Sequence, residues 1–502
     1  MTADTGNTPV TTTEPRPDTI EAPRTESATP SEPAASVDTA ATAHDGESGA
    51  SGDVVPFRQA TRTWFLISLQ TFGGPAGQIA VMQRHLVDER RWIGQRRFLH
   101  ALNYCMLLPG PEAQQLAIYI GWLLNGLRGG LVAGTLFVLP GMAALLGLSA
   151  LYVGLGDTTV VTGLFAGLAP AVVAIVAQAV WRVGRRALTG PLLVGFAVVA
   201  FVALAVFGLP FPLVIATAAG AGWAVHRWRP AMLRGGDGRH GGTTDGPPPL
   251  IPDHVLHHDP PSTRRTAGVL SVGLVAWFLP IALVAALTGT SSVYTQQGLF
   301  FSGTAVVTFG GAYAVLSYVA QRAVEHYTWL SAPDMVHGLA LAESTPGPLI
   351  MVVQFVAFLG AYHHPGALDP WLAGVVASLL TTWVTFVPCF LLVLLGAPYV
   401  ERLRGNHALS AALTAITAAV VGVIANLGLY FALHTLFTTT HTRTTGPFHL
   451  QLPALDALRL TPVVITGVAA LLIFRLRWPV LRVLGISAIL GLIAALAHLP
   501  GT

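Results

Sequence analysis

The feature that most constrains this chain is a succession of apolar runs of about 20 residues, separated by short polar breaks. A helix of that length is what crosses the roughly 30 Å hydrocarbon core of a bilayer. Only 10% of the residues are charged, whereas a soluble domain has about 25%. Such a chain cannot cover itself with polar surface. The sequence therefore predicts an all-α, polytopic membrane protein.

The apolar runs predict about 13 transmembrane helices. They are expected near residues 60–80, 112–127, 131–153, 160–181, 191–207, 212–226, 267–287, 297–317, 343–362, 371–396, 408–436, 460–474 and 477–498. The predicted domains are a disordered N-terminal tail (1–55), a first transporter repeat (56–226), a cytoplasmic linker (227–266), an extra linking helix (267–290) and a second repeat (291–502). The tail lacks the basic start and apolar core of a signal peptide. We therefore expect it to be cytoplasmic.

Matching motifs recur at a fixed distance along the chain. The same offset in residue number separates Phe72-Gly73-Gly74 from Phe309-Gly310-Gly311, Trp92 from Trp329, and Pro109-Gly110-Pro111 from Pro346-Gly347-Pro348. Farther on, a slightly longer offset separates Pro140 from Pro388 and, equally, Gln178 from Asn426. A constant offset with one insertion of about 11 residues indicates an internal duplication.

The number of predicted spans indicates how the two halves are oriented. Equivalent positions are separated by an odd number of spans, which predicts an inverted repeat. With the N-terminus inside, arginines fall mainly in cytoplasmic loops, as the positive-inside rule requires; they include Arg128, the cluster Arg182, Arg185 and Arg186, and Arg322. The loop 84–97, with five arginines, does not fit. Either a span is miscounted or this loop keeps its arginines for function.

Gly73, Gly74 and Pro75 interrupt the first apolar run, because glycines and proline do not propagate a regular helix. Gly310 and Gly311 interrupt the second half at the same point. A helix that begins inside a membrane offers free N–H groups and a positive dipole end to an anion. Paired interruptions in two inverted halves indicate a substrate site near the midplane. Close helix packing at Gly-Gly is an alternative role, compatible with the first.

The Pro-Gly-Pro segments form a second pair of breaks and, like the first pair, are candidates for binding the anion substrate. In the first half, Pro109, Gly110 and Pro111 precede a polar helix start. Glu112 suits the helix N-terminus or couples protons, and the amides of Gln114 and Gln115 are candidate donors to an oxyanion; a purely capping Glu112 is the alternative. In the second half, Pro346, Gly347 and Pro348 are followed by apolar residues. We therefore expect polar recognition to be concentrated in the first half.

Further charged residues could act on an anion or a proton. Arg90 and Arg91 are candidates for binding a dianion, with Glu89 as a proton-linked partner, although an interfacial loop anchored by Trp92 explains them equally well. Glu343 lies in an apolar run, where an ionisable group is a functional candidate; it couples protons or lies at the interface. We expect no metal and no cofactor, because metal-ligand spacings and nucleotide-binding motifs are missing from the sequence.

Together these residues resemble the chromate ion transporter family. The resemblance extends over about residues 60–440 and rests on Phe72-Gly73-Gly74-Pro75, Glu89-Arg90-Arg91-Trp92, Leu108-Pro109-Gly110-Pro111-Glu112-Ala113-Gln114-Gln115-Leu116-Ala117, Leu139-Pro140-Gly141 and Ser344-Thr345-Pro346-Gly347-Pro348. It implies a long, two-domain transporter that exports chromate from the cytoplasm, uses the proton gradient or the membrane potential, and confers chromate resistance. Sulfate is implied as a second substrate.

The predicted partners are a chromate or sulfate anion, protons and the lipid bilayer of the plasma membrane, and a homodimer is left open. A net charge of +3 gives no reason to expect nucleic-acid binding. One alternative function is transport of another anion. A membrane enzyme acting on lipid would need a catalytic cluster at one face, which the sequence does not offer, so we do not expect an enzyme. A scaffold or sensor would not need two broken-helix repeats.

Overall fold

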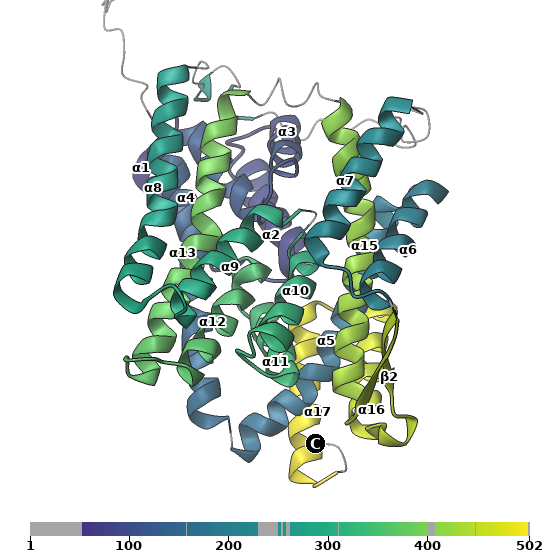
Figure 1. The fold of residues 1–502 in the computed structure, drawn as a ribbon. Helices are drawn as coiled ribbons and strands as arrows, with labels where there is room; N and C mark the ends of the chain where they lie inside the picture. The colour runs from purple at the N-terminus through teal and green to yellow at the C-terminus, as the bar shows by residue number, and fades with distance from the viewer. Residues whose placement is uncertain are drawn as a thin grey trace, which may run out of the picture. The chain divides into compact units, whose positions relative to one another are not determined.

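The computed structural model describes residues 53–156, 158–228, 249–252, 255–257, 262–309, 311–399, 407–446 and 448–499. The predicted tail 1–55, all but its last three residues, lies outside this part of the chain, as do most of the linker 227–266 and the candidate site residue Gly310. Figure 1 shows a bundle of helices with one small hairpin of strands.

The first half contains α1 (Phe57–Ser68), α2 (Gly74–Gln83), η1 (Arg84–Glu89), α3 (Gln95–Cys105), α4 (Glu112–Leu155), α5 (Thr159–Ala187), α6 (Pro191–Ala205) and α7 (Phe211–Trp228). The linking helix α8 (Thr263–Thr288) follows. The second half contains α9 (Val293–Val307), α10 (Ala312–Gln321), η4 (Arg322–His326), α11 (Ala332–Ser344), η5 (Leu349–Met351), α12 (Val352–His363), α13 (Pro370–Gly396), η6 (Ala397–Tyr399), α15 (His407–Leu436), β1 (Thr440–Thr445), β2 (Phe448–Pro453), η7 (Leu455–Ala457), α16 (Leu460–Ala470), η8 (Leu471–Arg475) and α17 (Val480–Leu496). The strands β1 and β2 pair antiparallel.

Five of the described helices, α4, α5, α8, α13 (extended by η6) and α15, are long and apolar enough to cross a bilayer. The helix α4 is not continuous, because Asn125 and Gly126 leave helical geometry and divide it into a short and a long segment. Shorter apolar helices, including α6, α16 and α17, complete the bundle. The prediction of an all-α polytopic membrane protein with two related halves is confirmed.

In the first half, the predicted span 60–80 consists of two half-helices, α1 and α2, and the predicted span 112–127 is a third half-helix that runs from the centre to the face where α1 begins. The backbone N–H of Val54, before α1, donates to Leu124 O at 3.2 Å, at the end of the short segment of α4. Leu250 N donates to Arg91 O at 2.7 Å. The start of α1, the turn after η1 and this end of α4 therefore meet the described part of the linker. We call this side of the molecule the linker face.

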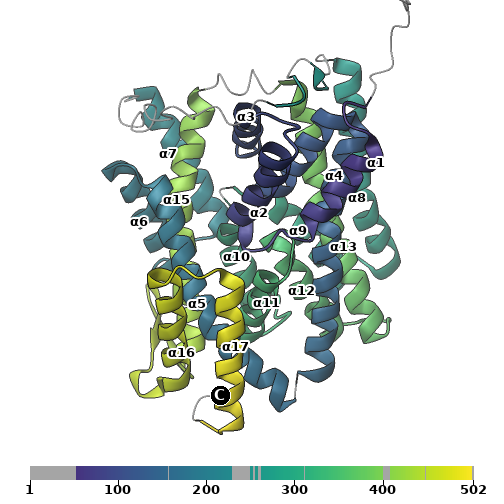
Figure 2. The same cartoon turned by 180° about the vertical axis from the view of Figure 1, so that it is seen from behind.

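The second half repeats this arrangement from the opposite side. Tyr294, at the start of α9, donates its hydroxyl hydrogen to Pro365 O at 2.8 Å, beyond the end of α12. Gly360, near the end of α12, packs against Trp329, in the turn after η4. We call this side the β-hairpin face, because β1 and β2 lie there, at the lower end of the bundle in Figures 1 and 2.

This arrangement explains the arginine-rich loop 84–97. The segment 60–80 consists of α1 and α2 on either side of a break, so it is not a crossing span. The loop consequently returns to the linker face, together with the N-terminal end of the described chain. For Arg322 the prediction of a position on the same side as the linker is wrong, because η4 lies at the β-hairpin face.

The tips of the broken helices interlock at the centre of the molecule. Gly110 N donates to Thr308 O at 2.8 Å, and Gly347 N donates to Thr71 O at 3.0 Å. The donors Gly110 and Gly347 are separated by the offset of the repeated motifs, and so are the acceptors Thr71 and Thr308. The two hydrogen bonds are therefore equivalent in the duplication. Each half thus satisfies a buried backbone donor of the other, which an apolar environment requires.

The long helices establish that the halves are inverted. Gly184 and Gly428 occupy opposite ends of the contact between α5 and α15: the first faces Val421 and the second faces Val176. The two helices are equivalents in the duplication, yet they pack antiparallel. Two equivalent helices can run in opposite directions only if one half is inverted relative to the other.

The last two helices of each half pack on the other half. In Figure 2, α16 and α17 lie beside α5, and in Figure 1, α6 and α7 lie beside α15. On α17, Gly491 meets the backbone of Gly167 in α5, while on α7, Gly222 meets Ala415 in α15. The offset from Gly222 to Gly491 is longer than the offset between the other equivalent positions. The β hairpin and η7, inserted before α16, account for the difference.

Candidate functional site

A cavity of about 340 Å³ lies between the two halves, where the half-helices α2 and α10 begin. Gly73, Gly74 and Pro75 line it from the first half, and Gly311 and Ala312 line it from the second. The paired Gly-Gly breaks that the sequence singled out are therefore brought to one site, except for Gly310, which lies outside the described residues.

Local sequence dictates that both helices begin at this point. Gly73 caps α2 with φ 80°, and Gly311 caps α10 with φ 105°. Residues that carry a Cβ rarely adopt such positive backbone angles. Pro75 occupies the first turn of α2, where its missing N–H costs no hydrogen bond. The first N–H groups of a helix have no partner within it and carry a positive partial charge. The cavity consequently receives two positive helix ends, one from each half.

Helix α5 adds two arginines to this cavity. Gln178, Arg182 and Arg186 line it at intervals of four residues, which places them on one face of the helix. Both arginine side chains are exposed. A guanidinium group binds a tetrahedral oxyanion through two parallel N–H donors. The sequence indicates a role for Arg182 and Arg186 only as markers of orientation, although their spacing with Gln178 predicts a polar helix face.

Two carboxyl groups complete the cavity lining. Glu112 comes from the start of α4 and Glu343 from the end of α11, one from each half. Glu343 is only 3% exposed and accepts a hydrogen bond from the hydroxyl of Tyr313. Arg182 lines the same cavity. A buried carboxylate is costly unless it is paired or protonated, so the Glu343 carboxyl group is a candidate for binding a proton in this cavity.

The Pro-Gly-Pro segments lie at the centre but are not among the cavity-lining residues. Gly110, Pro111, Gly347 and Pro348 are buried, and the amides of Gly110 and Gly347 donate to the opposite half, as described above. Pro109 and Pro346 are half-buried. These segments therefore hold the half-helices in place.

The glutamines of this region are buried as well. The Gln115 side chain donates to Pro109 O at 2.6 Å, and Gln78 donates to Gly347 O at 2.6 Å. Gln114 is fully buried and makes no side-chain hydrogen bond. None of the three lines the cavity, so the observed role of Gln78 and Gln115 is to support the tips.

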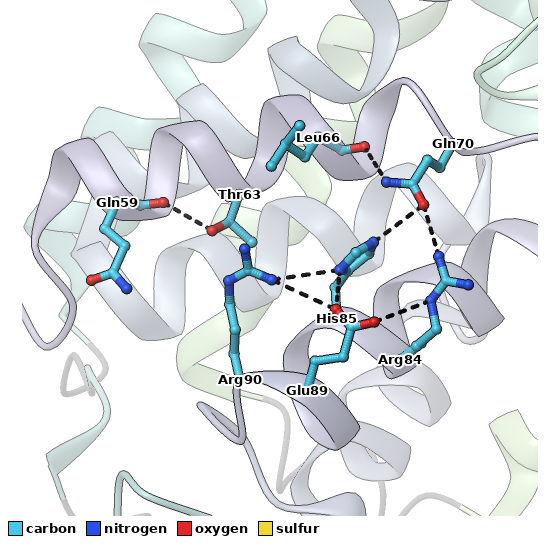
Figure 3. Close-up of polar contacts among 8 residues, drawn as sticks. All are labelled: Gln59, Thr63, Leu66, Gln70, Arg84, His85, Glu89 and Arg90. Atoms are coloured by element: carbon cyan, nitrogen blue, oxygen red, sulfur yellow. Dashed lines mark hydrogen bonds and ion pairs between the residues drawn. The ribbon is translucent and has the colours of Figure 1, made fainter.

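The predicted charged group at Glu89 lies between η1 and α1 (Figure 3). The Glu89 carboxylate is 2.6 Å from Nδ1 of His85, 3.6 Å from Nε of Arg84 and 3.8 Å from Nη1 of Arg90. Arg90 also stacks on Trp92, 5.7 Å from the ring centre. This cluster belongs to the linker face and contributes nothing to the lining of the central cavity. Arg91 follows it in the turn, with φ 55°.

Inverted halves joined through broken helices, around a cavity with two helix N-termini and two arginines, define a membrane transporter with a site suited to an anion. A comparison of sequences identifies the family: its model, "Chromate transporter", matches residues 58–223 and 295–492. The chain belongs to the chromate transporter family.

Curated relatives agree with this assignment. A chromate transport protein of Pseudomonas aeruginosa is 31% identical over 71% of this chain and 76% of its own length. One of Cupriavidus metallidurans is 28% identical over 73% of this chain and 80% of its own length. An uncharacterized transporter of Methanocaldococcus jannaschii is 23% identical over 73% of this chain and 82% of its own length. No solved structure matches the chain at a significant level.

Proposed function

We propose that this protein transports chromate out of the cytoplasm through the central cavity. The observation that carries the proposal is the convergence of two helix N-termini and the arginines Arg182 and Arg186 in one cavity. Chromate and sulfate are both tetrahedral dianions, and this set of donors suits either. Relatives named chromate transport proteins favour chromate as the substrate and sulfate as the second candidate.

The proposed orientation of the protein rests on the arginines of the linker face. They include Arg84, Arg90, Arg91, Arg96, Arg97, Arg128, Arg185, Arg186, Arg264 and Arg265. By the positive-inside rule this face is cytoplasmic. With this face inside, the N-terminus is cytoplasmic, and export from the cytoplasm requires that the multi-pass protein lie in the plasma membrane. Arg182 and Arg186 belong to the last turns of α5, toward this face, where they can collect anions from the cytoplasm. Export from there confers chromate resistance.

The first prediction concerns the substrate. In everted membrane vesicles that contain the protein, labelled chromate accumulates when a proton gradient or membrane potential is imposed, and excess sulfate reduces the uptake if both anions share the site. Vesicles from cells without the protein give the baseline. If neither chromate nor sulfate moves above this baseline, the proposed substrates are wrong.

A second prediction concerns coupling to protons, for which Glu343 is the favoured group among Glu89, Glu112 and Glu343. Glu343→Gln keeps the hydrogen-bonding shape and removes the titratable group. In proteoliposomes we expect this variant to lose its response to a pH gradient and to keep chromate–chromate exchange, which needs no net proton movement. Asp88→Asn, at the exposed linker face, is the matched control. An unchanged response to the pH gradient in Glu343→Gln would assign coupling to another group, with Glu112 tested next.

A further inference from the structure

A second cavity, of about 440 Å³, opens toward the β-hairpin face. Its polar lining comes from α10, η4, α15 and β2, and consists of Ser317, Gln321, Glu325, Asn426, Tyr430 and Gln451. Among its described lining residues there is one carboxylate and no arginine. The cavity is therefore unlike the central one, and its charge suits a proton or cation better than an anion.

The duplication relates the two cavities. The offset that separates Pro140 from Pro388 also relates Gln178, Arg182 and Arg186 of α5, in that order, to Asn426, Tyr430 and His434 of α15. The inverted halves thus place equivalent helix faces on opposite sides of the membrane, with arginines toward the linker face and Tyr430 and His434 toward the β-hairpin face. The two aromatic rings pack together, with centroids 4.3 Å apart.

A stripe of polar side chains on α10 and η4 connects the two cavities. Tyr313, Ser317, Gln321 and Glu325 follow one another at intervals of four residues, which places them along one face. Tyr313 lines the central cavity, whereas the other three line the second one. We call these four residues the α10 stripe.

Hydrogen bonds join the α10 stripe to its neighbours. At its inner end the Tyr313 hydroxyl donates to Glu343. At its middle Asn426 Nδ2 donates to Ser317 Oγ at 3.4 Å. At its outer end Gln321 and Glu325 lie one helical turn apart and line the same cavity. The Tyr430 hydroxyl, buried beside this path, makes no protein hydrogen bond, so a water molecule in the cavity is its natural partner.

The first half does not have such a stripe. The residues equivalent to Tyr313, Ser317, Gln321 and Glu325 are Ala76, Ala80, Arg84 and Asp88. Two alanines interrupt the series, and an arginine replaces a glutamine. The polar connection is therefore a property of the second half alone, and the requirements of helix packing common to both halves do not explain it.

We propose that the α10 stripe, together with water in the second cavity, carries protons between the β-hairpin face and Glu343, and that Glu325 is the group that exchanges them with the medium. This inference rests on the proposed function. The proton protonates the Glu325 carboxylate, moves along water and the hydroxyl groups of Ser317 and Tyr313, which both donate and accept, and protonates Glu343. No other atom is transferred.

The surroundings of Glu325 suit a group that exchanges protons. It lies in η4, between α10 and α11, outside the apolar helices. Burial raises the pKa of the Glu325 carboxyl group, while the neighbouring Gln321 side chain and His434 act in the opposite direction. The groups that face it from the packed elements are Gln321 on α10, Tyr430 and His434 on α15, and Gln451 on β2. No other described carboxyl group lines this cavity.

The test uses Glu325→Gln in proteoliposomes that contain a pH-sensitive dye. Chromate–chromate exchange should stay within about twofold of wild type, while chromate flux driven by a pH gradient, and the accompanying proton movement, should fall by roughly tenfold or more. Gln321→Leu, which leaves Glu325 in place and interrupts the α10 stripe, should have the same effect. Asp456→Asn, an exposed carboxylate after the β hairpin, is the control and should behave as wild type.

The outcomes separate the two proposals. If the wild-type protein performs no chromate exchange, the proposed function fails. If exchange is normal and both Glu325→Gln and Gln321→Leu keep their pH-driven flux, the proton path is wrong and the proposed function stands. If either variant loses exchange and pH-driven flux together, that residue has a structural role and the proton path is also overturned.

Discussion

Replacing Arg182 with alanine is expected to reduce chromate transport by roughly 30-fold or more. Truncating one partner of a desolvated charge pair costs about 2–5 kcal/mol, and each 1.4 kcal/mol corresponds to about tenfold in affinity. The lower end of that range applies here, because the Arg182 side chain is exposed in the free cavity. Arg186→Ala should act in the same direction, and the double variant should retain only background flux. Initial rates of chromate exchange in proteoliposomes, measured over a range of chromate concentrations, test this.

Arg185 provides a matched control on the same helix. It has the same side chain and the same exposure as its neighbours, but it is directed at the ring of Trp181, 5.9 Å away, and does not line the cavity. Arg185→Ala should therefore transport chromate at close to the wild-type rate. Equal losses in Arg185→Ala and Arg182→Ala would show that net positive charge at the linker face matters, and that the cavity does not bind the anion as proposed.

The sequence was sufficient to predict the halves and the positions of their breaks. Gly73-Gly74 and Pro109-Gly110-Pro111 are local signals, since glycine and proline oppose a regular helix wherever they occur. Their recurrence at one common offset reveals the duplication without any knowledge of packing. How deep a segment reaches into the membrane, by contrast, cannot be predicted from such local signals. Two half-helices such as α1 and α2 contain as many apolar residues as one crossing helix, so hydropathy alone does not distinguish them.

The packing of the last two helices of each half on the other half, which we call the exchange of helices, could not be predicted either, and the reason is related. The residues of α16 and α17 follow their equivalents in α6 and α7 at a longer offset than the rest of the repeat, because the β hairpin shifts the register. Without that alignment, the sequence does not show that Gly222 and Gly491 are equivalent positions. The helix that each of them contacts is determined by how the two halves cross in space, and no local sequence pattern predicts it.

The candidate site was predicted in part for similar physical reasons. The N-termini at Gly73 and Gly311 line the cavity, in accordance with what a broken helix can offer an anion. The amides of Gly110 and Gly347, predicted for the same role, donate instead to Thr308 and Thr71 of the opposite half. A sequence shows that a helix is interrupted, but not which carbonyl group satisfies the amides that the interruption frees.

The exchange of helices leads to the last prediction: Gly222→Val and Gly491→Val should both prevent stable folding or lower the melting temperature strongly. A Cβ at Gly491 would overlap the backbone of Gly167, and one at Gly222 would overlap the Ala415 side chain and lie 2.9 Å from Ala411 O. Inserting a side chain into a packed contact costs about 1–3 kcal/mol, and more where backbone must move. Thermal unfolding in detergent, followed by the loss of the monodisperse protein, measures the effect.

The chain offers an open control glycine on each of these helices. Gly220 in α7 and Gly485 in α17 have no atom within 4 Å of an added Cβ, so Gly220→Val and Gly485→Val should unfold close to the wild-type temperature. Valine is tolerated in a lipid-facing helix, so propensity alone cannot produce the difference. Gly222 and Gly491 are equivalent positions, and each contacts the opposite half. The two variants should therefore lower the melting temperature to a similar extent only if the last helices of each half pack on the other half. A large loss in only one of them would contradict the reciprocal exchange and the pseudo-twofold relation on which the two cavities depend.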